Sequence, residues 1–207
     1  MAKDYDGYKV YTKHRAYDIV MGMARPCLRF FLHMTIVNKE MIPKEGAAVI
    51  AGNHRAAIDP ALVNTCTKRV VHTLAKKALV DSPMGFFFKA GQVIPVDQSK
   101  EHNHAALDTA VEYLKAGYLI NVSPEGKRNR TDAPLLPEFK YGAVVMAQRT
   151  GVPIVPYAIT GGYKLFGKNR IEFGEPFSVE GMDRDEANKK LYGEILALVE
   201  KGREIAK

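Results

Sequence analysis

The sequence has little cysteine and no long uncharged run. Its two cysteines, Cys27 and Cys66, are too few for a disulfide framework among 207 residues, and they fit a reducing cytoplasm. No uncharged stretch approaches the ~20 residues that a helix needs to cross a bilayer. The first 13 residues are polar and charged, unlike a secretory signal peptide. We therefore predict a cytoplasmic protein that buries one substantial core.

Several catalytic motifs are also missing. Neither G-x-S-x-G nor a P-loop is present, which argues against a serine hydrolase or a nucleotide-hydrolysing enzyme. His102 and His104 could join His54 and Asp59 around a metal, but no metal-site spacing such as H-E-x-x-H occurs. We interpret His102 and His104 as surface residues at the start of a helix. The sequence thus predicts no metal and no other cofactor.

Positive charge points to a partner that carries phosphate. The net charge is +7, from 30 Lys and Arg against 23 Asp and Glu. An anionic membrane, coenzyme A or acyl carrier protein, and nucleic acid would all suit this charge. The ten tyrosines are scattered rather than interleaved with a basic stripe, so we expect no nucleic acid.

Residues 1–40 are predicted to form an N-terminal amphipathic helical segment. Polar residues recur every three or four positions on one face, and apolar residues fill the other. The polar face comprises Arg15, Asp18, Gly22, Arg25, Arg29 and His33, and the apolar face comprises Val20, Met23, Ala24, Cys27, Leu28 and Phe31. Pro26 leaves either one kinked helix or two shorter ones. The apolar face could lie in the headgroup boundary of a membrane or pack on the rest of the protein.

Residues 41–207 alternate short apolar runs with helical stretches. Strands are predicted over residues 47–51, 70–75, 92–96, 118–122, 154–159 and 170–173. Helices are predicted over residues 59–66, 83–89, 101–115, 137–150 and 184–206. This alternation is typical of an α/β fold with a largely parallel central sheet flanked by helices.

His54 and Asp59 are a candidate general base and its carboxylate partner. A histidine can accept a proton near neutral pH, and a carboxylate fixes its tautomer and stabilises the cation. Five residues apart is wrong for one helical face, so we expect a turn that folds Asp59 back toward His54. Alternatively, Asp59 is only the N-cap of a helix that begins at Pro60, and His54 is a surface residue.

A second candidate site follows the apolar run 118–122. Lys127, Arg128 and Arg130 fall within four residues, after Glu125 and Gly126. Arginine binds phosphate with a planar fork, and glycine lets backbone N–H groups come close to an anion. The loop could instead be an ordinary solvated basic turn.

Taken together, four ordered blocks resemble the glycerolipid acyltransferase family. The blocks are N-H-R-A-A-I-D at 53–59, G-F-F-F-K-A-G with I-P-V-D at 85–97, S-P-E-G-K-R-N at 123–129, and V-P-I-V-P at 152–156. The resemblance covers nearly the whole chain. It implies that residues 41–207 form an acyltransferase domain, peripheral on the cytoplasmic membrane face, that uses acyl-CoA or acyl carrier protein as donor and a lysophospholipid as acceptor.

The resemblance also implies roles for individual residues. His54, oriented by Asp59, would deprotonate the acceptor hydroxyl, which then attacks the thioester of the donor. Backbone amides near residues 124–126 or in the second block would stabilise the oxyanion. The predicted substrate-binding residues are Lys89, Glu125, Gly126, Lys127, Arg128 and Arg130.

One departure concerns the acceptor. The family often has Arg directly after the Asp of the second block, where this chain has Gln98. The favoured product is phosphatidic acid from lysophosphatidic acid. Another lysolipid or hydroxylated lipid stays open as acceptor, and so does a non-catalytic basic domain that binds lipid or nucleic acid.

Overall fold

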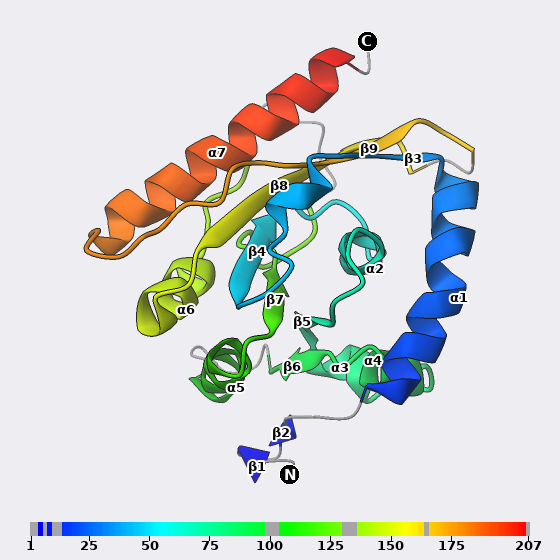
Figure 1. Ribbon diagram of the computed structural model, residues 1–207, viewed down its shortest axis with the longest axis horizontal. Coiled ribbons are helices and arrows are strands. Elements are labelled where there is room, and N and C mark those ends of the chain that lie inside the picture. Colours follow the sequence, from blue (N-terminus) through cyan, green and yellow to red (C-terminus); the bar gives the residue numbers. More distant parts are fainter. Residues whose placement is uncertain are drawn as a thin grey trace.

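The chain alternates strands and helices around a central seven-stranded sheet, as a computed structural model shows (Figure 1). The structure describes residues 4–5, 8–9, 14–97, 104–129, 136–163 and 166–205. The helices are α1 (Arg15–Leu32), α2 (Asp59–Thr65), α3 (Lys77–Val80), α4 (Gly85–Ala90), α5 (His104–Lys115), α6 (Gly142–Thr150), α7 (Arg184–Ile205) and the 3-10 helix η1 (Lys39–Met41). The strands are β1 (Asp4–Tyr5), β2 (Tyr8–Lys9), β3 (Met34–Val37), β4 (Ala48–Gly52), β5 (Val71–Lys76), β6 (Ile94–Val96), β7 (Leu119–Val122), β8 (Ile154–Gly161) and β9 (Asn169–Phe173).

The order of strands in the large sheet is β3-β9-β8-β4-β7-β5-β6. Neighbouring strands run parallel except β8 and β9, which pair antiparallel with Ile159 opposite Ile171. Strands β1 and β2 form a separate antiparallel pair. The predicted α/β fold with a largely parallel sheet is therefore confirmed.

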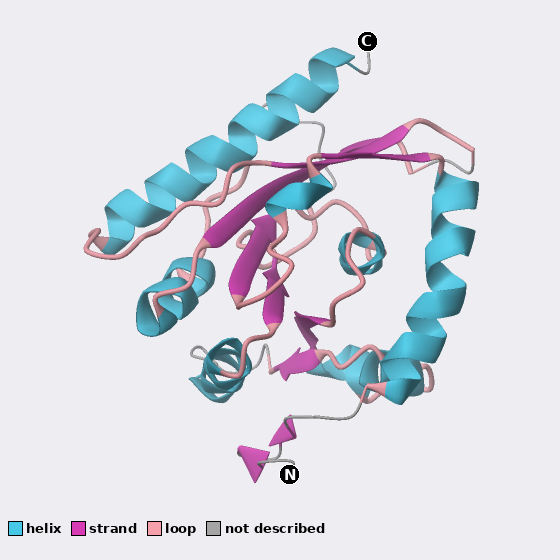
Figure 2. Cartoon of the chain, in the orientation of Figure 1, coloured by secondary structure: helices cyan, strands magenta, loops and turns pink. Residues whose placement is uncertain are grey.

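Helices cover both faces of the sheet, because the central strands are apolar on both sides. Val49 and Ala51 of β4 belong to a core with α5, α6 and α7, whereas Ala48 and Ile50 belong to a core with α2. All five residues of β4 are buried. Figure 2 shows α5, α6 and α7 on one side of the sheet, with α1 and α2 on the other.

Some predicted elements differ from the observed ones. Strand β3 was not predicted, since its four residues are only partly covered and lie at the edge of the sheet. The helix predicted over 137–150 begins only at Gly142, because the Lys140 N–H donates to the Pro124 carbonyl at 2.8 Å and holds the preceding residues out of the helix. Asp59 is the first residue of α2 rather than its N-cap.

Helix α1 is one helix that continues through Pro26. Its buried residues, Tyr17, Met21 and Leu32, lie beside the predicted apolar face, of which Leu28 also packs against the core. Met23, on the predicted apolar face, is 65% exposed. The Arg25 and Arg29 side chains donate to the carbonyls of Asn64 and Thr65, at the C-terminal end of α2. Cations suit the negative end of a helix dipole, so these contacts fix α1 against α2.

Two further observations concern membranes and thiols. Within the described ranges, no helix is both long and apolar enough to cross a bilayer. Cys27 is exposed and Cys66 is buried, and both are free thiols.

Because His72 of β5 is buried, the free energy of unfolding should depend on pH. Its ring is buried, stacks on Tyr113 at 3.8 Å between centroids, and donates from Nδ1 to the Gln92 carbonyl at 3.0 Å. Burial, with a smaller contribution from His14, lowers its pKa from 6.5 to about 4. The neutral ring is therefore the form that the fold requires. As the pH falls from 6.5 toward 4, the unfolded chain gains a proton that the folded chain does not, and the free energy of unfolding should drop by up to about 3 kcal/mol.

Urea unfolding at pH 7 and pH 5 would measure about 2 kcal/mol of this drop. The His72→Gln variant lacks the titrating ring, so its stability should change less between the two pH values. An equal change in both proteins would contradict the assignment.

Candidate active site

Three parallel strands bring the candidate site together at one edge of the sheet. β4 lies between β7 and β8, and all three run in the same direction. Their carboxyl ends lead into residues 53–58, 123–129 and 162–163 respectively. Ligands commonly bind at this edge of an open α/β sheet.

His54 and Asp59 are in contact, as the expected turn requires. The His54 Nδ1 lies 3.0 Å from the Asp59 Oδ2, and residues 56–58 form the bend and turn between them. The His54 side chain is 21% exposed, while that of Asp59 is fully buried. Because a carboxylate can only accept, Nδ1 carries the proton and the lone pair of a neutral ring lies on Nε2. Nε2 has no hydrogen-bond partner among the described residues, so it is available to a substrate.

Four donors hold the Asp59 carboxylate. Besides the imidazole, Oδ2 accepts the backbone N–H groups of Arg55 at 2.7 Å and Ala56 at 2.8 Å. Oδ1 accepts the Tyr163 hydroxyl at 2.6 Å. Asp59 therefore closes the turn after β4 instead of capping α2, and a buried charge with several donors is far less costly than an unpaired one.

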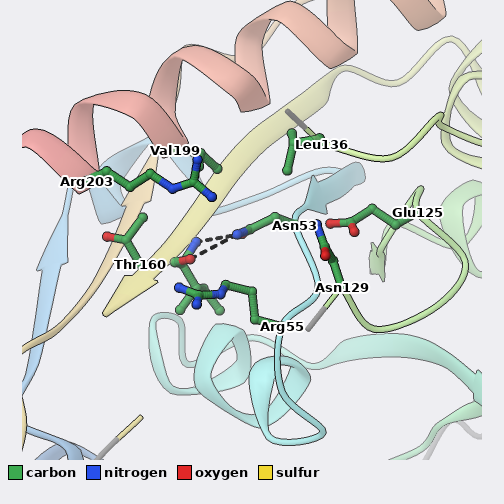
Figure 3. A pocket seen from close by; sticks show the side chains of 9 residues that line it. Asn53, Arg55, Glu125, Asn129, Leu136, Thr160, Val199 and Arg203 are labelled. Atoms are coloured by element: carbon green, nitrogen blue, oxygen red, sulfur yellow. Dashed lines mark hydrogen bonds between the residues drawn. The ribbon is translucent and has the colours of Figure 1, made fainter. Parts of the chain in front are cut away.

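Asn53 fixes the start of this turn to the neighbouring strand. Its side chain donates to the Ile159 carbonyl at 2.9 Å and accepts the Ile159 N–H at 2.7 Å. Figure 3 shows this pair of bonds, with Arg55, Thr160 and Arg203 around the same small void. The void measures about 10 Å³, which is about the space of one water molecule.

The third block clamps the backbone of His54. The Glu125 Oε1 accepts the His54 N–H at 2.8 Å, and the Asn129 N–H donates to the His54 carbonyl at 2.6 Å. Glu125 is 3% exposed, and burial raises the pKa of its carboxyl, with His54 opposing that effect. The predicted base and the predicted basic loop, 71 residues apart, thus form one unit.

Gly126 allows the tight turn of this loop. Its φ of +68° is one that side chains with a Cβ rarely adopt, and an added Cβ would lie 2.8 Å from the Lys140 Cε. Its N–H already donates to the Ser123 carbonyl at 3.1 Å, and Pro124 has no N–H. Of the predicted oxyanion donors around residues 124–126, the Glu125 N–H is therefore the one left, and the amides of the second block stay a prediction.

The predicted cationic residues do not all lie in the same part of the structure. Lys127 and Arg128 are exposed, and their side chains form no ion pair or hydrogen bond within the described part of the chain. An open cavity of about 580 Å³ is lined by Lys127, Lys140, Phe139 and Tyr141, among others. Lys89 is exposed near the end of α4, and no described hydrogen bond or ion pair joins its side chain to the His54 turn. Arg130 and Gln98 lie outside the described residues, as does His102.

Sequence reasoning missed two members of the site. Tyr163 lies 104 residues after Asp59, and Asn129 belongs to the third block but had no predicted role of its own. No local pattern marks a tyrosine in a connection between strands as a partner of a distant carboxylate. The hydrogen bond depends on the pairing of β4 with β8 and on contacts of the β8–β9 connection, which the spacing of residues does not specify.

A match to a known protein family includes all four blocks. The model of the family described as "Acyltransferase" matches residues 33–160. A protein named 1-acyl-sn-glycerol-3-phosphate acyltransferase from Bacillus subtilis (strain 168) is 33% identical over 148 residues, which cover 68% of this chain and 72% of that protein. A protein of the same name from Borreliella burgdorferi is 31% identical over 156 residues, or 72% of this chain and 62% of that protein.

A solved structure shares the fold. The crystal structure of the 1-acyl-sn-glycerophosphate acyltransferase PlsC from Thermotoga maritima aligns with a TM-score of 0.70 and 24% identity. The alignment covers 89% of this chain and 77% of that chain. The resemblance inferred from the four blocks is confirmed.

Proposed function

Because the chain belongs to the acyltransferase family, we propose that it moves a fatty acyl group from an acyl thioester to the hydroxyl of lysophosphatidic acid, which gives phosphatidic acid. Its relatives are named 1-acyl-sn-glycerol-3-phosphate acyltransferases, and such an enzyme acylates a hydroxyl, so the chain is an O-acyltransferase. The observation that carries the proposal is the contact of His54 with Asp59, clamped by the third block. This arrangement suits proton removal from an acceptor hydroxyl beside a phosphate.

The proposed mechanism is a direct transfer. His54 Nε2 removes the proton of the acceptor hydroxyl while Nδ1–H stays bonded to Asp59. The oxygen bonds to the thioester carbon, giving a tetrahedral intermediate. The carbon–sulfur bond then breaks, and the leaving thiolate takes the proton from the imidazolium. Each proton is returned within one turnover, and no covalent acyl-enzyme is needed.

The acceptor phosphate is proposed to bind at the third block. The exposed side chains of Lys127 and Arg128 belong to the loop whose Glu125 and Asn129 hold His54. A phosphate bound there would place a nearby glycerol hydroxyl toward the base. Lys89 and Arg130 are proposed as further contacts, on the resemblance alone. The donor is proposed to be acyl-CoA or acyl carrier protein.

The protein is further proposed to work on the cytoplasmic face of a membrane, through the N-terminal segment 1–40. Ile19, Met23 and Phe30 of α1 are each more than 60% exposed, although large apolar side chains usually avoid water. Such side chains on a helix with basic residues suit an anionic interface. A lipid acceptor would be reached there without leaving the bilayer.

His54→Ala tests the base. Removing a general base typically lowers the rate by about 10²–10⁴-fold. The rate of phosphatidic acid formation should therefore fall by at least about 100-fold while the fold is retained. Mass spectrometry would follow the product from oleoyl-CoA and lysophosphatidic acid on liposomes. His104→Ala, at an exposed histidine that opens α5, is the matched control and should keep wild-type activity. A His54→Ala variant with more than about a tenth of the wild-type rate would overturn the mechanism.

Arg128→Ala tests the acceptor. Loss of a charge-assisted contact with the phosphate should raise the KM for lysophosphatidic acid by about tenfold or more. The KM for the acyl donor should change less. Lys189→Ala removes an exposed cation on α7 and should leave both constants unchanged. If Arg128→Ala alters neither constant, the phosphate does not bind at this loop. An acceptor without a phosphate monoester would then be tried first, as Gln98 suggests.

Vesicle flotation tests the membrane contact. Wild-type protein should float with phosphatidylglycerol vesicles more than with phosphatidylcholine vesicles, and less at high salt. Met23→Glu with Phe30→Glu should lower the bound fraction about tenfold or more, because two apolar contacts become charged. Ile205→Glu, at an equally exposed apolar residue of α7, serves as control. Equal vesicle binding by both variants would show that this face of α1 does not contact the membrane.

A further inference from the structure

The connection between β8 and β9 reaches from the His54–Asp59 pair to the end of α1. β8 ends at Gly161 beside the site, and β9 begins at Asn169. Figure 1 shows this connection, yellow to orange, beside the C-terminal end of α1. Its Phe166 N–H donates to the Phe31 carbonyl at 2.7 Å.

Tyr163 in this connection supplies the only donor that the structure describes for Asp59 Oδ1. The other carboxylate oxygen accepts three hydrogen bonds from the His54 turn, so its environment is set locally. Oδ1 depends instead on the Tyr163 hydroxyl at 2.6 Å. Burial and the neighbouring Asp59 both raise the pKa of Tyr163, so the phenol stays protonated and donates at every working pH.

The position of Tyr163 is itself held by α1 and β9. Its φ of +52° is unusual for a side chain of this size, and such a backbone persists only where the surroundings impose it. The Tyr163 N–H donates to the Asn169 Oδ1 at 2.9 Å, and the Asn169 Nδ2 donates to the Leu32 carbonyl at 2.7 Å. Leu32 is the last residue of α1.

Exposed aromatic rings strengthen the same junction. Phe166 lies 5.9 Å from Phe30 and 5.7 Å from Phe31 between ring centroids, and 5.5 Å from His33. Phe30 and Phe166 are both at least half exposed. Aromatic pairs at these distances contribute beyond their buried area, so the connection is tied to α1 by packing as well as by hydrogen bonds.

We propose that Tyr163 is a positioning residue that orients Asp59 and shares its charge, and that the contact of Phe166 with α1 holds Tyr163 in place. This inference rests on the proposed role of His54 as base. With the phenol present, part of the carboxylate charge is neutralised on the side away from the imidazole. Without it, the whole charge faces the imidazole, which favours the protonated ring.

The other groups around Asp59 do not replace this contact. The Arg55 guanidinium donates to the Gly161 carbonyl, and the Glu125 carboxylate bonds the His54 backbone. Tyr157 is buried close enough for Asp59 to raise its pKa, but its hydroxyl forms no described bond to that carboxylate. Loss of the Tyr163 hydroxyl would therefore leave Oδ1 buried and without a hydrogen-bond donor from the described residues.

Titration of His54 by NMR in ¹⁵N-histidine-labelled protein tests the proposal without any substrate. Without the Tyr163 hydrogen bond the Asp59 carboxylate stabilises the protonated imidazole more strongly, so Tyr163→Phe should raise the titration midpoint of His54. Tyr17→Phe is the matched control. The buried Tyr17 hydroxyl bonds the backbone of residues 69 and 71 and has no bond to Asp59, so its loss should lower stability and leave the midpoint unchanged. An unchanged midpoint in Tyr163→Phe would overturn the proposal.

Acyl transfer from hexanoyl-CoA to a short-chain lysophosphatidic acid without vesicles gives a second readout. Tyr163→Phe should lower kcat at neutral pH by up to about tenfold with little change in KM, and the loss should shrink as the pH is raised, because a more basic ring needs a higher pH to lose its proton. A loss that is equal at all pH values would indicate a merely structural role and overturn the proposal. Failure of the proposed function would be recognised separately, because the wild type would then make no product while its NMR titration stayed measurable.

The link to α1 is tested by Phe166→Ala. If Phe166 acts through Tyr163, Phe166→Ala should raise the titration midpoint of His54. The midpoint of the double variant should then be no higher than that of Tyr163→Phe alone. Additive effects of the two substitutions would show that Phe166 acts elsewhere and would overturn the link.

Discussion

The site depends on a buried carboxylate that needs hydrogen-bond donors from three parts of the structure. Asp59 is fully excluded from solvent, and a buried charge without donors would cost several kcal/mol. Its donors come from the turn after β4, from the His54 ring and from the β8–β9 connection. These segments meet only when β4 and β8 pair in the observed register, with Ile50 opposite Val155. Formation of the base is therefore coupled to formation of the central sheet.

The parallel sheet also explains why base and cations are neighbours. β7 lies on the other side of β4 from β8, so the third block emerges beside the His54 turn and bonds both its N–H and its carbonyl. Exposed Lys127 and Arg128 then extend from a loop whose root is fixed. A rigid scaffold with the reactive groups on its loops is the usual arrangement in enzymes of this architecture.

Much of the fold could be predicted from sequence, because the central strands are short, mostly apolar runs that contain β-branched residues. The contact of His54 with Asp59 was also predictable, since it joins residues five apart. Strand β3 was missed because a short, half-covered edge strand has little apolar pattern. The late start of α6 and the role of Tyr163 depend on bonds to Pro124 and Asp59, which are close in space and distant in the chain. Local propensity carries no information about such partners.

Helix α2 has a geometric consequence for the membrane. Its first residue is Asp59, and its last carbonyls hold Arg25 and Arg29 of α1. Seven helical residues span only about 10 Å, whereas the hydrocarbon layer of a bilayer is about 30 Å thick. A protein docked through α1 would thus reach one leaflet and leave its product there. On that proposal, the product would be added to a single leaflet.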